Sequence, residues 1–221
     1  MEEDKPFDFI DCVNIFKSTG KSAKGLRDLR VMIDQISEES LFHHTCQYFM
    51  EPRVLEYTND FARWIGESLE ERALSEQLST IDPFELRDIP SLRTALIGII
   101  DRYLQHFSEH RHAQPGDEFY FLETITITFS AGVRARNLAE FLTAIRYIDS
   151  GCIYYHFYEA RIRHGTDDFS TWFEDALEKQ DLAKTIRSID PFMHTTEGIR
   201  QHIIETVEKQ VKNDMEGVIA S

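Results

Sequence analysis

The chain has 221 residues, of which 42% are hydrophobic, which is typical of a globular protein with a substantial core. Its 39 acidic and 24 basic residues give a net charge of -15, so the average surface repels phosphate backbones and anionic membranes, and we expect no nucleic-acid partner. No apolar run approaches the roughly 20 residues that span a bilayer, and the start lacks a secretory signal, so we expect a cytoplasmic protein without membrane contact.

The three cysteines, Cys12, Cys46 and Cys152, are odd in number and lack the spacing of a metal or redox motif. No two of these cysteines correspond when the chain is aligned with itself at a shift of 112 or 108 residues. We therefore expect reduced, buried cysteines that act as small apolar residues.

Two stretches of the chain resemble each other over most of its length. A shift of 112 residues places Phe9 on Phe121, Gly20 on Gly132, Leu26 on Leu138 and His44 on His156. A shift of 108 residues places Asn59-Asp60-Phe61 on Asp167-Asp168-Phe169, Trp64 on Trp172, and Ile81-Asp82-Pro83-Phe84 on Ile189-Asp190-Pro191-Phe192. A period this long indicates a tandem duplication. We predict repeats at 6–104 and 118–212, joined by a polar linker at 105–117 and fused into one compact body.

Each predicted repeat opens with a strand. Apolar and polar residues alternate from Phe121 to Phe129, which predicts a half-buried strand with Ile125, Ile127 and Phe129 on its inner face; the stretch from Phe9 to Ile15 is a weaker version. Gly20 and Gly132 are expected to end these strands. Apolar residues then recur at helical spacing, Leu26, Leu29, Ile33 and Ile36 in the first repeat and Leu138, Phe141, Ile145 and Ile148 in the second.

More helices follow in each repeat. The segments 41–49 and 153–163 are dense in aromatic residues and histidine, and we interpret both as helices. A longer helix is expected over 61–81 and again over 169–189, ended by Pro83 and Pro191, and a last helix over 92–104 and 199–211.

A single strand in each repeat would leave backbone donors and acceptors unpaired. We therefore predict that the two strands pair antiparallel across a pseudo-two-fold axis. The predicted fold class is α+β and predominantly α-helical.

Features shared by both repeats most simply serve folding. In the shared Asp-Phe-x-x-Trp motif we expect the aromatic residues in the core, with Thr58 or Asn59, and Thr166 or Asp167, capping the helix. Arg93 and Arg200 follow the Ile-Asp-Pro-Phe turns and either brace them through the aspartates or bind a carboxylate or phosphate.

The segment from Lys17 to Ser22 contains Gly-Lys-Ser between a strand and a helix. It is not a P-loop, because Ile15 occupies the position of the first required glycine. The segment is nevertheless part of the most basic stretch of an acidic chain, with Lys17, Lys21, Lys24, Arg27 and Arg30, and an anion contact here stays open.

The segment from Tyr154 to His164 gathers the most ionisable and polar aromatic groups. We list as candidate ligand contacts Tyr154, Tyr155, His156, Glu159 and Arg161 facing His43 and His44, together with Arg93 and Arg200. The spacing matches no metal signature, so we assign no metal; the alternative set is His44, His156 and Glu159, which a symmetry axis would bring together.

Several segments of the sequence resemble a family of uncharacterised prokaryotic proteins classed as a domain of unknown function. They are Tyr57-Thr58-Asn59-Asp60-Phe61-Ala62, Ile153 to Arg161, Asp167-Asp168-Phe169-Ser170 and Ile189-Asp190-Pro191-Phe192-Met193-His194. The resemblance extends over most of the chain and implies no activity, cofactor or catalytic residue.

The sequence favours a ligand-binding or regulatory module whose partner, a small molecule or a protein, binds at the junction of the repeats. Duplication without an enzyme signature is the reason. The alternative is a hydrolase, with or without a metal, that uses His44, His156 and Glu159. A third hypothesis, a structural subunit of an assembly, predicts an exposed apolar patch.

Overall fold

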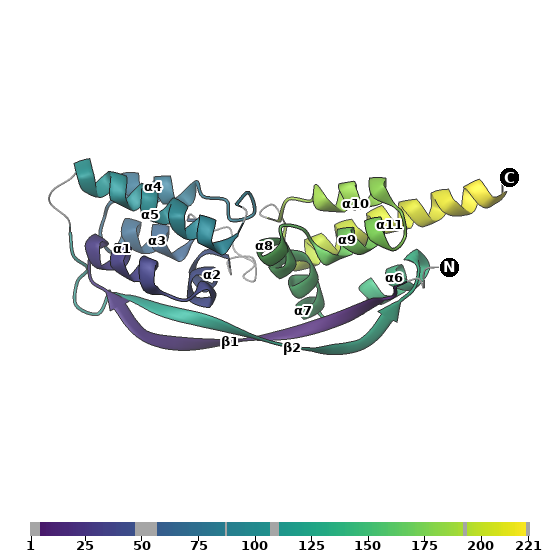
Figure 1. The fold of residues 1–221 in the computed structure, drawn as a ribbon, viewed down its shortest axis with the longest axis horizontal. Coiled ribbons are helices and arrows are strands. Elements are labelled where there is room, and N and C mark those ends of the chain that lie inside the picture. The colour runs from purple at the N-terminus through teal and green to yellow at the C-terminus, as the bar shows by residue number, and fades with distance from the viewer. Residues whose placement is uncertain (1–4, 47–56, 87, 107–110, 192–193, 220–221) are drawn as a thin grey trace. The chain divides into compact units, whose positions relative to one another are not determined.

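A computed structural model describes residues 5–46, 57–86, 88–106, 111–191 and 194–219 (Figure 1). Two long strands, β1 (Phe7–Ala23) and β2 (Phe119–Ala135), form a two-stranded antiparallel sheet, and the other regular elements are helices. The predicted α+β class and the predicted antiparallel pairing are confirmed.

Side-chain contacts along the two strands give their register. Thr126 Oγ1 donates to Asn14 Oδ1 at 2.9 Å, and Lys17 Nζ donates to Glu123 Oε1 at 2.9 Å. Asn14 therefore lies beside Thr126. These two residues correspond under the shift of 112, and the pseudo-two-fold axis stays a prediction.

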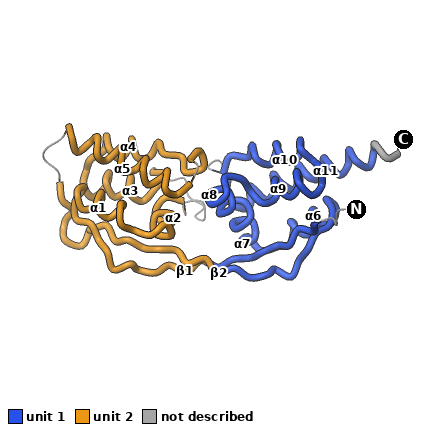
Figure 2. The backbone as a smooth tube through the Cα atoms, viewed as in Figure 1, with its two compact units in different colours: residues 1–13, 127–221 blue, residues 14–126 orange. Residues whose placement is uncertain are grey.

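The described chain forms two compact units, and the boundary between them falls inside both strands (Figure 2). Unit 1 consists of residues 1–13 and 127–221, and unit 2 of residues 14–126. These bounds differ from those of the predicted repeats, 6–104 and 118–212. The repeats and the linker stay an interpretation of the sequence.

Among its described residues, unit 2 contains half of each strand and the helices α1 (Leu26–Gln35), α2 (Glu38–Cys46), α3 (Asp60–Glu67), α4 (Arg72–Ser79) and α5 (Ile89–His106). Unit 1 contains the other halves and the later helices: α6 (Leu138–Ile145), α7 (Ser150–Ile153), a π-helix (Tyr154–Glu159), α8 (Ala160–His164), α9 (Asp168–Asp175), α10 (Gln180–Arg187) and α11 (Thr196–Ile219). The predicted first helix of each repeat and the helices over 41–46 and 153–163 are present; the end of the segment 41–49 lies outside the described residues.

Each strand packs on the helices of the other predicted repeat. Phe9 of β1 is fully buried in unit 1, with its ring centroid 5.6 Å from that of Phe141. Phe119 of β2 packs in unit 2 against Phe61 at 5.2 Å. The aromatic clusters therefore tie each strand to helices that are distant in the sequence, which makes the exchanged strand part of each core.

The middle of the ribbon is exposed, and this corrects the expected inner face. Ile125, Ile127 and Phe129 expose 43%, 48% and 47% of their surface, whereas Phe121 exposes none. The reason is that the helices cover mainly the first residues of each strand, around Phe9 in β1 and around Phe121 in β2.

The glycines expected to end the strands lie within them. Gly20 and Gly132 adopt φ angles of 72° and 70°, a conformation that favours glycine, and both strands continue to Ala23 and Ala135. The Gly20 amide donates to Ser18 Oγ at 3.2 Å, and Gly132 does the same to Ser130 at 3.1 Å. The glycines thus bend the strands and do not end them.

The predicted long third helix is wrong in both repeats, because it is two helices. Glu70 and Glu178 have positive φ angles of 54° and 55° and separate α3 from α4 and α9 from α10. The Glu71 amide donates to Ile65 O at 3.1 Å, and the Lys179 amide to Phe173 O at 2.8 Å, as in a Schellman motif. The five-residue step from Leu69 to Leu74 marks this break in the sequence.

Candidate functional site

His44, on α2, connects the exchanged strand to α3 in unit 2. Its Nε2 accepts a hydrogen bond from the backbone amide of Leu122 at 3.0 Å, and its Nδ1 lies 2.9 Å from Asp60 Oδ2. Because the amide can only donate, Nε2 carries no proton, so Nδ1–H donates to Asp60. Ser40 Oγ donates to Leu122 O at 2.6 Å. Side chains of α2 thus satisfy both backbone groups of Leu122, at a sheet edge where the described part of the chain places no further strand.

His156, in the π-helix, makes the same contacts in unit 1. Its Nε2 accepts from the Ile10 amide at 2.8 Å, and its Nδ1 lies 2.7 Å from Asp168 Oδ2. Both histidines are buried. Each therefore uses both ring nitrogens within its own unit, which supports a structural role. The predicted meeting of His44 and His156 stays a prediction.

The Asp-Phe-x-x-Trp motif completes this contact. Asp60 orients His44, Phe61 is fully buried, and Trp64 Nε1 donates to Asp117 O, just before β2, at 2.7 Å. Trp172 makes the corresponding bond to Lys5 O at 2.8 Å. The motif therefore holds the exchanged strand, as well as contributing to the core as predicted.

One group among the described residues has the chemistry of metal ligands: His43, His44 and Asp60, with ligand atoms within 4.8 Å of one another. His43 Nδ1 lies 2.8 Å from Thr124 Oγ1, and His44 already contacts Asp60 and Leu122. A metal here would cost His44 one of these bonds. Sequence reasoning included the histidines but not Asp60, because the partners lie 16 residues apart on different helices.

Arg161 and Glu159, both predicted to contact a ligand, form hydrogen bonds and ion pairs inside unit 1. Arg161 donates to Ile189 O and Ile186 O, both at 2.9 Å, and to Asp167 Oδ2 at 3.0 Å. The buried Glu159 accepts from Arg163 Nε at 2.9 Å. These contacts terminate α10 and neutralise buried carboxylates, which supports structural roles.

Tyr154 is buried and Tyr155 is half-buried beside His156. The pKa of Tyr155 lies above its ordinary value because of its partial burial and the nearby Asp168 and Glu159. A phenol with a raised pKa stays protonated at neutral pH and is a poor base.

Arg93 and Arg200 both terminate the first helix of their unit. Arg200 Nη1 donates to Ile145 O at 2.7 Å and to Ile148 O at 2.8 Å, at the end of α6. Arg93 donates in the same way to Ile33 O on α1. Cationic donors at a helix carboxyl end satisfy carbonyls that have no intrahelical partner. The contacts described for the two arginines thus support a structural role at the ends of α1 and α6. The predicted bracing of the Ile-Asp-Pro-Phe turns through the aspartates stays a prediction.

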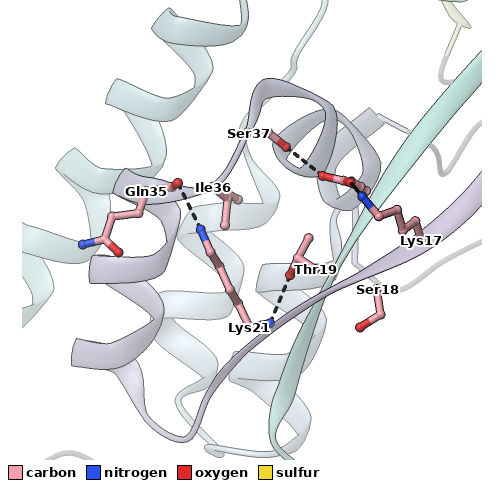
Figure 3. A pocket seen from close by; sticks show the side chains of 8 residues that line it. Lys17, Ser18, Thr19, Lys21, Gln35, Ile36 and Ser37 are labelled. Carbon is pink, nitrogen blue, oxygen red and sulfur yellow. Dashed lines mark hydrogen bonds and ion pairs between the residues drawn. The ribbon is translucent and has the colours of Figure 1, made fainter.

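An open cavity of about 480 Å³ in unit 2 is lined by Lys17, Ser18, Thr19, Lys21, Gln35, Ile36, Ser37 and Glu123 (Figure 3). It lies between β1 and the end of α1. Lys21 Nζ donates to Gln35 O at 3.3 Å, and Ser37 Oγ donates to Glu123 Oε2 at 3.4 Å. These long, weak contacts leave donors available to a ligand.

The cavity carries more positive than negative charge. Lys17 and Lys21 are its cations and Glu123 is its carboxylate, with Lys17 Nζ 2.9 Å from Glu123 Oε1. The Lys17 ammonium, together with Lys21 and Ser37, holds the pKa of Glu123 below its ordinary value. In a chain with a net charge of -15, two ammonium groups at one cavity form a local site for anions.

Unit 1 lacks this combination. Under the shift of 112, Phe129 and Val133 occupy the positions of Lys17 and Lys21. The histidine contacts recur in both units and serve the fold, whereas the lysines occur in one. The basic cavity is therefore our candidate functional site, and sequence reasoning indicated it only through the open anion contact near Lys17 and Lys21.

Residues 4–208 match the model of a family described as "Family of unknown function (DUF5752)". The chain belongs to this family. A solved structure of OrfY from Thermoproteus tenax is similar to the DUF5752 chain, with 29% sequence identity, a TM-score of 0.79, and coverage of 93% of this chain and 95% of that one. No curated protein matches. The predicted resemblance to a family of unknown function is confirmed, and its prokaryotic origin stays a prediction.

None of the described helices of the DUF5752 chain has the length and apolar character that crossing a membrane requires. Its three cysteines are buried thiols outside any disulfide, as expected. Burial and nearby negative charges raise the pKa of Cys12 to about 12 and that of Cys152 to about 11. Such thiols are poor nucleophiles at neutral pH.

Proposed function

We propose that this chain is a cytoplasmic binding protein that takes a small anionic ligand, bearing a carboxylate or a phosphate, in the cavity between β1 and α1 of unit 2. The observation that carries the proposal is the presence of Lys17 and Lys21 at one cavity of an otherwise acidic chain. Apolar residues at the corresponding positions of unit 1 argue that the fold itself does not need these lysines.

Binding would use the ammonium N–H groups of Lys17 and Lys21 that the described hydrogen bonds leave available. Each ammonium has three N–H groups. Lys21 spends one on Gln35 O and Lys17 one on Glu123. An anion between them would accept charge-assisted bonds, each contributing about 1.5–3 kcal/mol. Glu123 disfavours an anion near Lys17, so we expect Lys21 to contribute more.

The cavity supports binding more than catalysis. The residues that line it are two lysines, three hydroxyl residues, a glutamine, an isoleucine and a glutamate, and no histidine or cysteine is among them. The histidines of the hydrolase hypothesis have both ring nitrogens in use. The position of a ligand at the junction of the repeats stays a prediction.

The test is calorimetric titration of the full chain with inorganic phosphate and with citrate, which separate phosphate from carboxylate recognition. We expect Lys21→Gln to weaken binding about tenfold or more and Lys17→Gln to weaken it less. Lys24→Gln, which removes an exposed lysine outside the cavity lining, is the matched control and should bind like the unmodified chain. Affinity should also fall at higher salt.

The proposal fails if neither anion binds, or if Lys24→Gln weakens binding as much as Lys21→Gln. The second result would indicate diffuse attraction by surface lysines. Urea denaturation of each variant shows whether a loss of binding comes from a loss of folding.

A further inference from the structure

A second cavity in unit 2, of about 350 Å³, lies along α4 and is separate from the basic cavity. It is lined by Tyr57, Arg72, Ser75, Glu76, Ser79 and Thr80. The four residues from α4 are at positions i, i+3, i+4 and i+7 and so share one face of that helix. Ser75 is buried, whereas Arg72 and Glu76 are exposed, so the cavity has a hydroxyl floor and a charged rim.

In unit 1 an ion pair occupies the corresponding place. Under the shift of 108, Gly66 corresponds to Glu174 and Ser79 to Arg187. Arg187 Nη2 donates to Glu174 there, and Arg187 Nε donates to Thr166 Oγ1 at 3.3 Å. Unit 2 thus has small residues in place of both members of the pair.

The small residues of unit 2 leave a cavity beside α4 and a buried hydroxyl without a hydrogen-bond partner among the described residues. Ser79 Oγ is buried and has no hydrogen-bond partner among the described residues. A buried hydroxyl without a partner destabilises the fold, and a hydrogen bond to a ligand or a water would remove that cost. A Cβ at Gly66 would lie 2.9 Å from both Ser75 Oγ and Tyr57 Oη, so only glycine lets these hydroxyls lie as they do.

The floor and the rim indicate the ligand's chemistry. Ser75 Oγ already donates to Ala62 O and Thr80 Oγ1 to Gln77 O, so both offer only acceptor lone pairs to a ligand. Glu76 adds a carboxylate where unit 1 has Lys184. Acceptors with a carboxylate fit a cationic donor, and the guanidinium of Arg72 fits a carboxylate.

We propose that this cavity binds a small zwitterion of the amino-acid type, whose cationic group takes the place that the Arg187 guanidinium fills in unit 1. Glu76 pairs with that cation at the rim, Ser79 accepts from it, and Arg72 holds the ligand's carboxylate. The ligand differs in charge from that of the basic cavity, so this proposal stands independently of the proposed function.

The experiment is calorimetric titration of the full chain with L-arginine and with agmatine, which has the guanidinium but no carboxylate. We expect saturable binding of L-arginine at one site. Arg72→Gln should weaken L-arginine about tenfold and leave agmatine unchanged, whereas Ser79→Ala should weaken both several-fold. Lys184→Gln, at the position in unit 1 that corresponds to Glu76, is the matched control and should change neither.

A triple variant, Tyr57→Gly with Gly66→Glu and Ser79→Arg, introduces the unit 1 ion pair and the unit 1 glycine at position 57 and should abolish binding of both ligands. Equal binding by this variant and the unmodified chain would overturn the proposal, as would no binding of either ligand, which would mean that the cavity holds water only. If the triple variant does not fold, Arg72→Gln decides: an equal loss for L-arginine and agmatine contradicts the assigned role of the carboxylate.

Discussion

Removing Arg161 should expose the cost of a buried charge in unit 1. The Asp167 carboxylate caps α9 through the Ser170 amide at 2.8 Å and is fully buried, and Arg161 Nη2 neutralises it from 3.0 Å. In Arg161→Ala the carboxylate stays buried without its cation, and Ile186 O and Ile189 O lose a donor. Loss of one partner of a buried pair costs about 3–5 kcal/mol, and we expect this decrease in the free energy of unfolding.

Unit 2 suggests a second substitution that should restore stability, because there a neutral residue caps the corresponding helix. Asn59 corresponds to Asp167; its side chain accepts from the Ala62 amide at 2.8 Å, and its Nδ2 donates to Leu78 O at 3.0 Å. Leu78 corresponds to Ile186. Adding Asp167→Asn to Arg161→Ala should therefore remove the buried charge, restore a donor to Ile186 O and recover about 2 kcal/mol or more.

Urea denaturation followed by tryptophan fluorescence and circular dichroism gives the four free energies of this double-mutant cycle. The control is Arg134→Ala, which breaks the exposed pair with Asp8 and should cost at most about 1 kcal/mol. The reasoning is refuted if Arg161→Ala costs no more than this control, or if Asp167→Asn makes the single variant less stable.

Three further predictions concern stability and reactivity. Glu178→Gly should raise the free energy of unfolding by about 1 kcal/mol in urea, because Glu178 has a φ of 55° that glycine adopts without strain; a loss of stability would contradict this. Phe121→Ala should cost about 3–5 kcal/mol and Phe129→Ala about 1 kcal/mol or less, since Phe121 is fully buried and Phe129 is 47% exposed; equal costs would mean that the middle of the ribbon is covered in solution. Cys12 and Cys152 should resist a thiol reagent at pH 8 until the chain is unfolded, and rapid labelling of the folded chain would contradict the burial of these thiols. The free energy of unfolding should decrease as the pH rises above 9.0, the ordinary thiol pKa, because the unfolded chain then loses the thiol protons that the folded chain keeps.

Local patterns were enough to predict the strands and their pairing, because alternation and unpaired backbone groups act over a few residues. Cap chemistry narrowed each helix cap to two neighbouring residues, Thr58 or Asn59 and Thr166 or Asp167, of which the structure has Asn59 and Asp167. The exchange of strands was not predictable. Phe9 and Phe121 belong to equivalent strands, and either would fit either set of helices, so the sequence does not decide which aromatic cluster each strand enters. The expected inner face at Ile125 was wrong for a related reason: alternation does not indicate how much of a strand the helices cover.

The candidate site was only partly predictable. His44 and His156 were identified as unusual, but their partners Asp60 and Asp168 lie on separate helices, and Leu122 lies 78 residues from His44. One signal was present: a histidine and an aspartate occupy corresponding positions in both predicted repeats, which indicates a pair that the fold needs. The opposite signal, lysines in only one repeat at Lys17 and Lys21, becomes informative once the structure places them at one cavity.

The claim that both buried histidines hold exchanged strands is tested most directly by the ¹⁵N chemical shifts of the histidine rings in the unmodified chain near neutral pH. We predict that His44 and His156 are the tautomer protonated at Nδ1, with Nε2 accepting from the amides of Leu122 and Ile10. A proton on Nε2 of either ring would contradict the account, because that nitrogen could then not accept from the strand.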